Sequence, residues 1–241
     1  MTRRELLVLA GGGALAQGAR GSPSREAQNL SYPLQAIQGT ITPADLFFVR
    51  DHFREPELSI ETWRLKIEGR VAHPVELSLA DLLESPAKKL EAVLECAGNT
   101  AGGSAVGNAV WEGVPLAYLL RQAGVEQGAT MALIEGGDSG KLTADSPNLP
   151  YCQLVPIAKC MRPESLVALK MNGRFLPRRN GFPARVLFPG WYAMDSVKWL
   201  RRIVVLSAGD STGGFEASGI NQVYNRIVET APRSSLRVKR R

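Results

Sequence analysis

Leu94-Glu95-Cys96-Ala97-Gly98-Asn99-Thr100-Ala101-Gly102-Gly103 carries one cysteine from an apolar run into a glycine-rich segment. The apolar residues 92–94 predict a strand that ends in a flexible loop. Because glycine has no Cβ, this loop leaves room for a bulky group to approach the backbone. The thiol of Cys96 could therefore be a nucleophile, a metal ligand or a packed, inert side chain.

The choice among these roles depends on the partners that the chain offers. A nucleophilic cysteine needs a nearby histidine as its base, and the chain has two histidines, His52 and His73. The nucleophile is therefore the weakest hypothesis, and the metal ligand and the packed thiol both stay open. The other cysteines, Cys152 and Cys160, could pair in an oxidising compartment, but we expect two buried thiols.

The composition predicts a folded domain with a nearly neutral body. The chain has 241 residues, of which 44% are hydrophobic and 22% charged, so it can bury a large core. The net charge is +6, but a C-terminal tail without acidic residues supplies most of it. No DNA or RNA motif accompanies this tail, so we do not expect nucleic acid as a partner. The basic residues of the tail are Arg233, Arg237, Lys239, Arg240 and Arg241.

The N-terminus predicts an export signal. Thr2-Arg3-Arg4-Glu5-Leu6-Leu7 places paired arginines before a weakly apolar run at 8–16. This pattern is typical of a twin-arginine signal, which would direct a folded protein to the periplasm. A frayed basic start is the alternative. The apolar run is too short and too weak for a stable membrane span, so we expect 1–30 to be signal and leader.

A second candidate segment is Phe47-Phe48-Val49-Arg50-Asp51-His52-Phe53. In an extended chain Arg50 and His52 point to the same side, and both can donate hydrogen bonds to an anion. The alternative is an ordinary strand end with a solvated arginine.

Local patterns predict a mixture of strands and short helices. Ser78 is a typical N-cap and Gly124 a typical helix stop. A glycine-rich turn at 136–140 would bring the carboxylate of Asp138 to a ligand. The predicted strands are 63–71, 131–135 and 203–206, and the predicted helices are 78–83 and 116–123.

A third segment, residues 169–200, alternates short apolar runs with proline and glycine. Turn-rich backbone of this kind can cradle phosphate. Arg185 and Lys198 each lie in an apolar setting there, and a buried cation needs an anionic partner. Together with Arg50 and His52, they indicate a deeply held anion.

Taken in order, these segments resemble the molybdopterin-binding domain of the sulfite oxidase family over about residues 45–207. The resemblance implies a mixed α+β domain at 31–209 around a buried molybdenum–molybdopterin cofactor. Residues 210–241 would be a linker and the truncated start of an immunoglobulin-like β-sandwich, which forms the homodimer contact in full-length relatives. The matching segments are Phe48-Val49-Arg50-Asp51-His52, Glu95-Cys96-Ala97-Gly98-Asn99, Trp111-Glu112-Gly113-Val114, Met171-Asn172-Gly173, Gly181-Phe182-Pro183-Ala184-Arg185, Pro189-Gly190 and Val197-Lys198-Trp199-Leu200.

The resemblance also implies roles for single residues. Cys96 would be the thiolate on molybdenum, because that metal favours a soft, deprotonated sulfur. Asn180 stands where relatives usually carry a histidine, and it can donate a hydrogen bond to phosphate but carries no charge. The cofactor contacts would come from Phe48, Val49, Arg50, Asp51, His52, Cys96, Asp138, Asn180, Arg185, Ser196, Val197 and Lys198.

The implied reaction is oxygen-atom transfer to a sulfur oxyanion, such as sulfite to sulfate, with electrons passed to an external cytochrome c. Arg50 would bind the oxyanion, and Tyr224 would lie near the transferred oxygen; a plain surface tyrosine is the alternative. Trp111 would line the site or, alternatively, lie in the core.

Two departures limit the substrate assignment. Thr100 and Ala101 stand where sulfite oxidases usually place an arginine, and a further substrate arginine belongs to the C-terminal domain. Sulfite is therefore the leading hypothesis among several. The alternatives are a sulfane dehydrogenase or a sulfoxide reductase on the same cofactor, or an inactive remnant without its second domain.

Overall fold

The computed structural model describes residues 26–141, 144–145 and 147–210. Tyr224, residues 1–25 and residues 211–241 lie outside this part of the chain. The expectations of an export signal, an active-site tyrosine and a truncated second domain therefore stay predictions.

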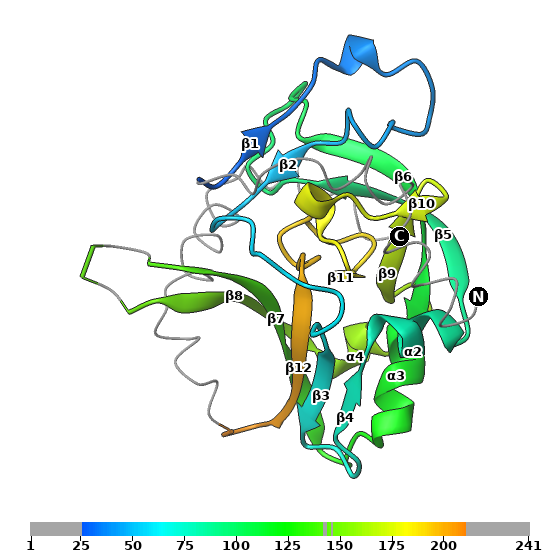
Figure 1. Cartoon of the computed structure of the whole chain (residues 1–241), viewed down its shortest axis with the longest axis vertical. Coiled ribbons are helices and arrows are strands. Elements are labelled where there is room, and N and C mark those ends of the chain that lie inside the picture. Colours follow the sequence, from blue (N-terminus) through cyan, green and yellow to red (C-terminus); the bar gives the residue numbers. More distant parts are fainter. Residues whose placement is uncertain (1–25, 142–143, 146, 211–241) are drawn as a thin grey trace.

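The described strands form two five-stranded sheets and one two-stranded sheet (Figure 1). In the first sheet the order is β10-β9-β6-β5, with β11 also paired to β9, and every pairing is antiparallel. Its strands are β5 (Lys88–Glu95), β6 (Val106–Pro115), β9 (Leu166–Met171), β10 (Arg174–Phe175) and β11 (Arg185–Leu187).

The second sheet has the order β4-β3-β12-β7-β8, and its β3–β12 pairing is parallel. In Figure 1, β12 runs between β3 and β7 through the middle of the molecule. The sheet consists of β3 (Leu65–Gly69), β4 (Val75–Leu77), β7 (Ala129–Gly140), β8 (Leu149–Pro156) and β12 (Leu200–Ser207), and the separate ribbon consists of β1 (Asn29–Leu30) and β2 (Val49–Arg50).

The α-helices α2, α3 and α4 lie at the end of the molecule away from β1 and β2 (Figure 1). The predicted N-cap is confirmed, because Asp81 N donates to Ser78 Oγ at 3.2 Å and Ser78 N donates to the Asp81 carboxylate at 2.8 Å. The predicted stop at Gly124 is also confirmed, with φ at 68°. No helix among the described residues has the length and apolar content to cross a bilayer. The helices are α2 (Leu79–Glu84), α3 (Leu116–Ala123), α4 (Ile157–Cys160), η1 (Leu34–Ala36) and η2 (Arg178–Asn180).

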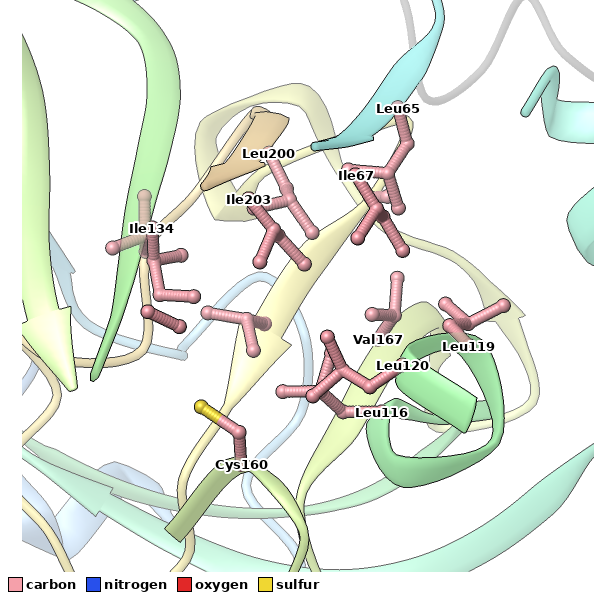
Figure 2. Packing of buried hydrophobic residues seen from close by; sticks show 14 of the residues in the cluster. Leu65, Ile67, Leu116, Leu119, Leu120, Ile134, Cys160, Val167, Leu200 and Ile203 are labelled. Atoms are coloured by element: carbon pink, nitrogen blue, oxygen red, sulfur yellow. The ribbon is translucent and has the colours of Figure 1, made fainter. Parts of the chain in front are cut away.

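The main core lies where α3 packs against β3 of one sheet and against β6 and β9 of the other (Figure 2). Burial of these apolar side chains is the main favourable contribution to folding. This core fixes the two sheets relative to each other and so supports any site formed between them. The residues drawn there include Leu65, Ile67, Leu116, Leu119, Leu120, Ile134, Val167, Leu200 and Ile203.

Cys152 and Cys160 are free, buried thiols, as the sequence predicted. Cys160 belongs to the main core, and Cys152 packs with Leu133 and Leu206 in a smaller cluster. Burial raises the pKa of each thiol to about 12. Neither thiol is therefore a reactive group at neutral pH.

The predicted turn at 136–140 is wrong, because β7 continues to Gly140. The register against β8 shifts between Glu135 and Ser139, which indicates a bulge. A Cβ on Gly136 would lie 2.9 Å from the Lys198 carbonyl oxygen, so the bulged strand approaches its neighbour too closely for a side chain. The bulge places Asp138, 3% exposed, inside the molecule rather than on a surface turn.

Candidate functional site

A cavity of about 300 Å³ lies between the β1–β2 ribbon, the end of β5 and the segment after β11. Its walls come from both large sheets, because β5 and β11 belong to the first sheet and β7 and β8 to the second. The volume is at the lower end of the range of small-molecule sites. The predicted site residues on its walls are Phe48, Val49, Arg50, Asp51, His52, Cys96, Asp138, Asn180, Arg185, Ser196, Val197 and Lys198.

Cys96 is half-buried, comes directly after β5, and lines the cavity. Its backbone N–H donates to Ala105 O at 2.9 Å, and its carbonyl accepts from Asn99 N at 3.0 Å. The Asn99 side chain fastens the same loop, since its Oδ1 accepts from Ala105 N at 3.0 Å. The thiol is thus presented to the cavity by a short, cross-braced loop, rather than enclosed among aliphatic side chains.

The segment that carries Arg50 is positioned by the β1–β2 ribbon. Arg50 pairs with Asn29 across the ribbon, and its guanidinium donates to the carbonyls of Leu30 at 3.2 Å and Val49 at 3.1 Å. His52 lines the same cavity, with its ring 4.6 Å from the ring of Phe53. Burial lowers the pKa of His52 below its ordinary value. The structure therefore brings Arg50 and His52 to one cavity, as the sequence predicted.

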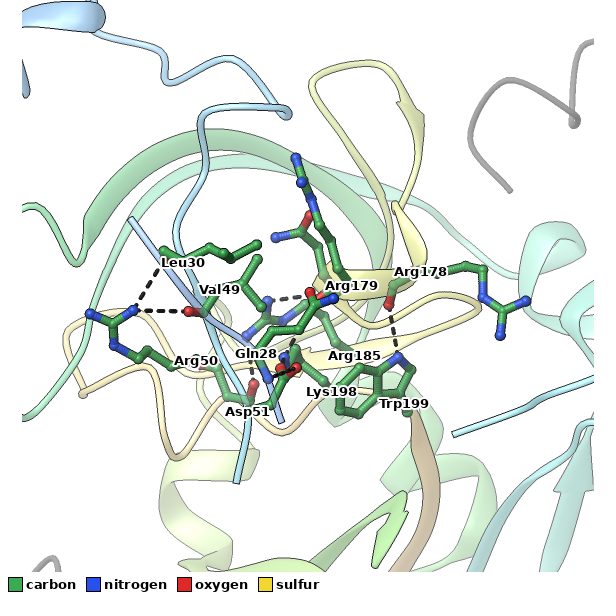
Figure 3. Close-up of polar contacts among 12 residues, drawn as sticks. Gln28, Leu30, Val49, Arg50, Asp51, Arg178, Arg179, Arg185, Lys198 and Trp199 are labelled. Carbon is green, nitrogen blue, oxygen red and sulfur yellow. Dashed lines mark hydrogen bonds and ion pairs between the residues drawn. The ribbon is translucent and has the colours of Figure 1, made fainter. Parts of the chain in front are cut away.

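Lys198 forms an ion pair with Asp51, whose carboxylate is fully buried (Figure 3). The other Asp51 oxygen accepts from Gln28 N at 3.0 Å, and Lys198 Nζ also donates to Arg179 O at 3.2 Å. Burial lowers the pKa of Lys198, while Asp51 opposes that shift. In the protein alone Lys198 has Asp51 as its anionic partner, and its predicted role toward a cofactor anion stays a prediction.

Arg185 is a fully buried cation. No carboxylate in the described part of the chain lies within ion-pair distance of its guanidinium. Its guanidinium donates to Asn180 O at 3.2 Å and to Ser196 O at 2.7 Å. Burial lowers the pKa of Arg185 to about 9. A guanidinium in this setting favours a bound anion, because burying an unpaired charge is costly.

Trp111 lies in the core behind Arg185 and not on the cavity wall, so the core alternative is the right one. The Arg185 guanidinium lies 5.5 Å from the Trp111 ring centroid, and the indole N–H donates to Ala92 O at 3.1 Å. The ring is thus a cation–π partner for the buried guanidinium.

Three residues that line the cavity each carry a buried polar atom without a hydrogen-bond partner: Asp138 Oδ1, Asn180 Oδ1 and Arg185 Nε. Burial raises the pKa of Asp138 to about 7. Unsatisfied buried polar atoms are rare in folded proteins, so three on one wall indicate a polar ligand. A phosphate could accept from Arg185 Nε, and ring or amino N–H groups could donate to Asp138 and Asn180. The residues present therefore fit a heterocycle that carries a phosphate.

The cavity wall also contains residues outside the predicted contact set, among them Asn29, Tyr151, Arg179 and Met194. The sequence offered a signal for Arg179, because this residue directly precedes Asn180 in the turn-rich segment that can cradle phosphate. Tyr151 had none, since it lies in an ordinary strand far from every motif. Its hydroxyl donates to Met194 O at 2.9 Å.

The fold and the cavity define a domain that places a thiol next to a site for a phosphate-bearing heterocycle. The sequence matches the family described as oxidoreductase molybdopterin binding domain over residues 52–213, and the chain belongs to this family, the cofactor-binding domain of sulfite oxidases. The cofactor that this domain binds is a molybdenum–molybdopterin, whose heterocycle, phosphate and metal match the chemistry of the cavity.

Related proteins extend the comparison. Mitochondrial sulfite oxidase of Drosophila melanogaster is 36% identical over 181 residues, which are 68% of this chain and 30% of that protein. Nitrate reductase [NADH] of Solanum lycopersicum is 33% identical over 199 residues, 73% of this chain and 22% of that protein. The crystal structure of the sulfane dehydrogenase SoxCD from Paracoccus pantotrophus superposes with a TM-score of 0.63 at 29% identity, covering 80% of this chain and 55% of that chain. The chain thus spans less than half the length of the curated relatives it matches, from 21% to 39%.

Proposed function

We propose that this chain is a molybdenum-cofactor oxidoreductase that oxidises a sulfur oxyanion, with sulfite to sulfate as the leading reaction. In that reaction sulfite gains an oxygen atom that derives from water, and two electrons and two protons are released. The electrons would pass to an external cytochrome c. The observation that supports this proposal is the single cavity shared by the Cys96 thiol, the Arg50 guanidinium and the buried, unmatched Arg185.

Within this proposal, different residues of the chain bind different parts of the cofactor. Cys96 would bind the metal through a soft thiolate. Arg185 would donate its free Nε–H to the cofactor phosphate, and Asp138 and Asn180 would accept from the heterocycle. The bound cofactor would supply oxygen-atom transfer and two-electron redox chemistry, and the protein would orient it and exclude water.

Arg50 is the residue we assign to the oxyanion. Its guanidinium is held by the carbonyls of Leu30 and Val49, which fix its orientation without neutralising its charge. Further N–H groups of the same guanidinium can donate to a small anion. His52 would add a hydrogen bond but little charge at neutral pH, because burial lowers its pKa.

The test combines elemental analysis with an assay. We expect about one molybdenum and one pterin per purified chain, with sulfite-dependent reduction of cytochrome c. A chain that folds but takes up no molybdenum or pterin would contradict the proposal and would favour the inactive-remnant alternative.

A sulfane dehydrogenase is the second candidate. The similarity to SoxCD supports it, as does the presence of Thr100 and Ala101 where sulfite oxidases usually have an arginine. Assays with sulfite and with protein-bound sulfane sulfur on the same loaded chain separate the two dehydrogenases. Oxidation of a reduced dye by a sulfoxide would instead identify a sulfoxide reductase.

We also propose export through the paired arginines, Arg3 and Arg4, to the periplasm. Cell fractionation of the parent and of a variant with both arginines changed to lysine tests this proposal. We expect the variant to stay in the cytoplasm. Equal periplasmic amounts of both would refute the assignment.

Whether the full protein forms a homodimer is tested by sedimentation.

A further inference from the structure

One loop connects the two chemically distinct ends of the cavity. Residues 193–196 follow β11, and Ala193, Met194 and Ser196 line the cavity. At one end Ala193 N donates to Glu95 O at 2.8 Å, directly before Cys96. At the other end Ser196 O accepts from Arg185 at 2.7 Å. The position of this loop therefore affects both the thiol and the buried guanidinium.

A third contact holds the middle of this loop. The Tyr151 hydroxyl donates to the carbonyl oxygen of Met194 at 2.9 Å. Tyr151 is 8% exposed and lies in β8 of the second sheet, while Glu95 and Arg185 lie in β5 and β11 of the first. The Tyr151–Met194 hydrogen bond thus links β8 of the second sheet to a loop whose other contacts reach β5 and β11 of the first sheet.

The direction of the Tyr151 proton is fixed by a second buried residue. Gln153 Nε2 donates to the Tyr151 hydroxyl oxygen at 3.0 Å, and Gln153 is 2% exposed. Because this amide occupies a lone pair of the hydroxyl, the proton is directed to Met194. The hydroxyl is engaged both as donor and as acceptor, so it is poorly suited to give a proton to a substrate.

We propose that Tyr151 is a positioning residue, which sets the place of the 193–196 loop and through it the separation of Cys96 from Arg185. The proposal rests on the proposed function, because it concerns the two ends of the same cofactor site. The Tyr151 ring also lies 5.5 Å from the His52 ring, a contact that a phenylalanine retains. The hydroxyl alone is the group under test.

The test compares Tyr151→Phe with Tyr118→Phe. Tyr118 lies on α3 against the main core and is not a cavity residue, so its variant controls for the loss of a phenol elsewhere. In the cofactor-free chain, the alkylation rate of Cys96 by iodoacetamide is measured by peptide mass spectrometry. Because Cys152 and Cys160 are buried with raised pKa values, the reaction reports on Cys96.

We expect Tyr151→Phe to react about fivefold faster at Cys96, the factor that corresponds to one net hydrogen bond, while Tyr118→Phe reacts like the parent. In the loaded chain, Tyr151→Phe should also shift the metal–thiolate absorption band and release pterin faster. Gln153→Met, which frees the hydroxyl to rotate, should give a smaller effect in the same direction, and it serves as the test if Tyr151→Phe does not fold.

Equal alkylation rates in Tyr151→Phe, Gln153→Met and the parent would overturn the proposal. So would an equal acceleration in Tyr118→Phe, because the effect would then be general loosening. The alkylation comparison needs no cofactor. A parent chain without molybdenum would thus refute the proposed function while the positioning role of Tyr151 is still decided.

Discussion

The thiol of Cys96 and that of Cys152 have the same chemistry but opposite surroundings. Cys96 is half-buried on the cavity wall, whereas Cys152 packs in a small apolar cluster and has its pKa raised to about 12. The surroundings, and not the residue type, determine which sulfur can be deprotonated by a metal.

We predict that Cys96→Ser lowers turnover of the loaded chain by more than about 100-fold, because a serine hydroxyl stays protonated and is a harder, weaker ligand. The fold should persist, since the substitution is nearly isosteric at a half-buried position. Steady-state kinetics and circular dichroism measure the two effects. Cys152→Ser is the matched control: it should cost stability but keep activity, and similar turnover in both variants would contradict the ligand assignment.

Asp138 gives a prediction about pH. Burial raises its pKa from 3.8 to about 7 in the folded chain. Between these values the folded state retains a proton that the unfolded state has lost, so the contribution of Asp138 to stability falls as pH rises from about 4 to about 7 and then stays level. In the cofactor-free chain, Asp138→Asn should therefore be more stable than the parent above pH 7, by up to about 4 kcal/mol.

This advantage of Asp138→Asn should shrink as the pH falls toward 4. Urea unfolding of parent and variant at several pH values between 4 and 8 measures it. Groups that do not interact with Asp138 contribute to both curves alike, so the difference reports on Asp138 and on its interactions with Lys198 and Asp51. A difference that stays constant over this range would show that the carboxyl of Asp138 keeps its ordinary pKa.

At the scale of elements, the end of η2 determines where the two buried cations lie. Gly181 follows η2 with φ at 110°, and a Cβ there would lie 3.1 Å from the Cβ atoms of both Arg185 and Lys198. Gly173 also has positive φ, at 79°, but a Cβ there would meet nothing within 4 Å. A substitution at Gly173 would therefore cause backbone strain alone, whereas one at Gly181 would cause backbone strain and also crowd Arg185 and Lys198.

We predict that Gly173→Ala costs about 1 kcal/mol of unfolding free energy, the penalty of a left-handed backbone for a residue with a Cβ. Gly181→Ala should cost about 2 kcal/mol or more and should also lower the molybdenum content, because Arg185 and Lys198 are displaced. Denaturant unfolding and elemental analysis test this. Equal losses of stability and unchanged metal content in both variants would show that η2 does not position the cations.

Local patterns predicted the elements that local interactions determine. The strand into Cys96, the Ser78 cap and the Gly124 stop each depend on residues close in sequence, and the structure contains all three. The extension of β7 was missed, because its bulge depends on contact with the distant Lys198 carbonyl. Turn residues such as glycine cannot reveal that kind of contact.

The candidate site was predicted in its members but not in its pairings. Every predicted contact residue within the described chain lines the cavity. The sequence did not show that Asp51 neutralises Lys198, because the two residues are 147 positions apart. It also did not reveal Tyr151, whose role depends on the meeting of two sheets.

At the scale of the whole molecule, the cavity between the two large sheets contains buried polar and charged groups that the protein itself leaves without partners. The buried Arg185 lacks a matching carboxylate, and Asp138 and Asn180 each have an unsatisfied oxygen there. Each of these features lowers the stability of the cofactor-free chain. A ligand that satisfies them binds the folded state alone and therefore stabilises the entire fold, not the site alone.

We predict that loading with the cofactor raises the midpoint of thermal unfolding by about 5–10 °C, as expected when free ligand exceeds its dissociation constant about 100-fold. Arg185→Met should lose most of this increase, because it removes the guanidinium available to the phosphate. Arg202→Met is the control. Arg202 lies on β12, pairs with Glu68 of β3 and Glu135 of β7, and is not a cavity residue. The cofactor should therefore raise the unfolding midpoint of this variant as much as that of the parent. Calorimetry of the three proteins, loaded and cofactor-free, measures the increase. Equal midpoints for the loaded and cofactor-free parent would mean that the unsatisfied groups are met by water, and that the cavity does not couple the cofactor to the fold.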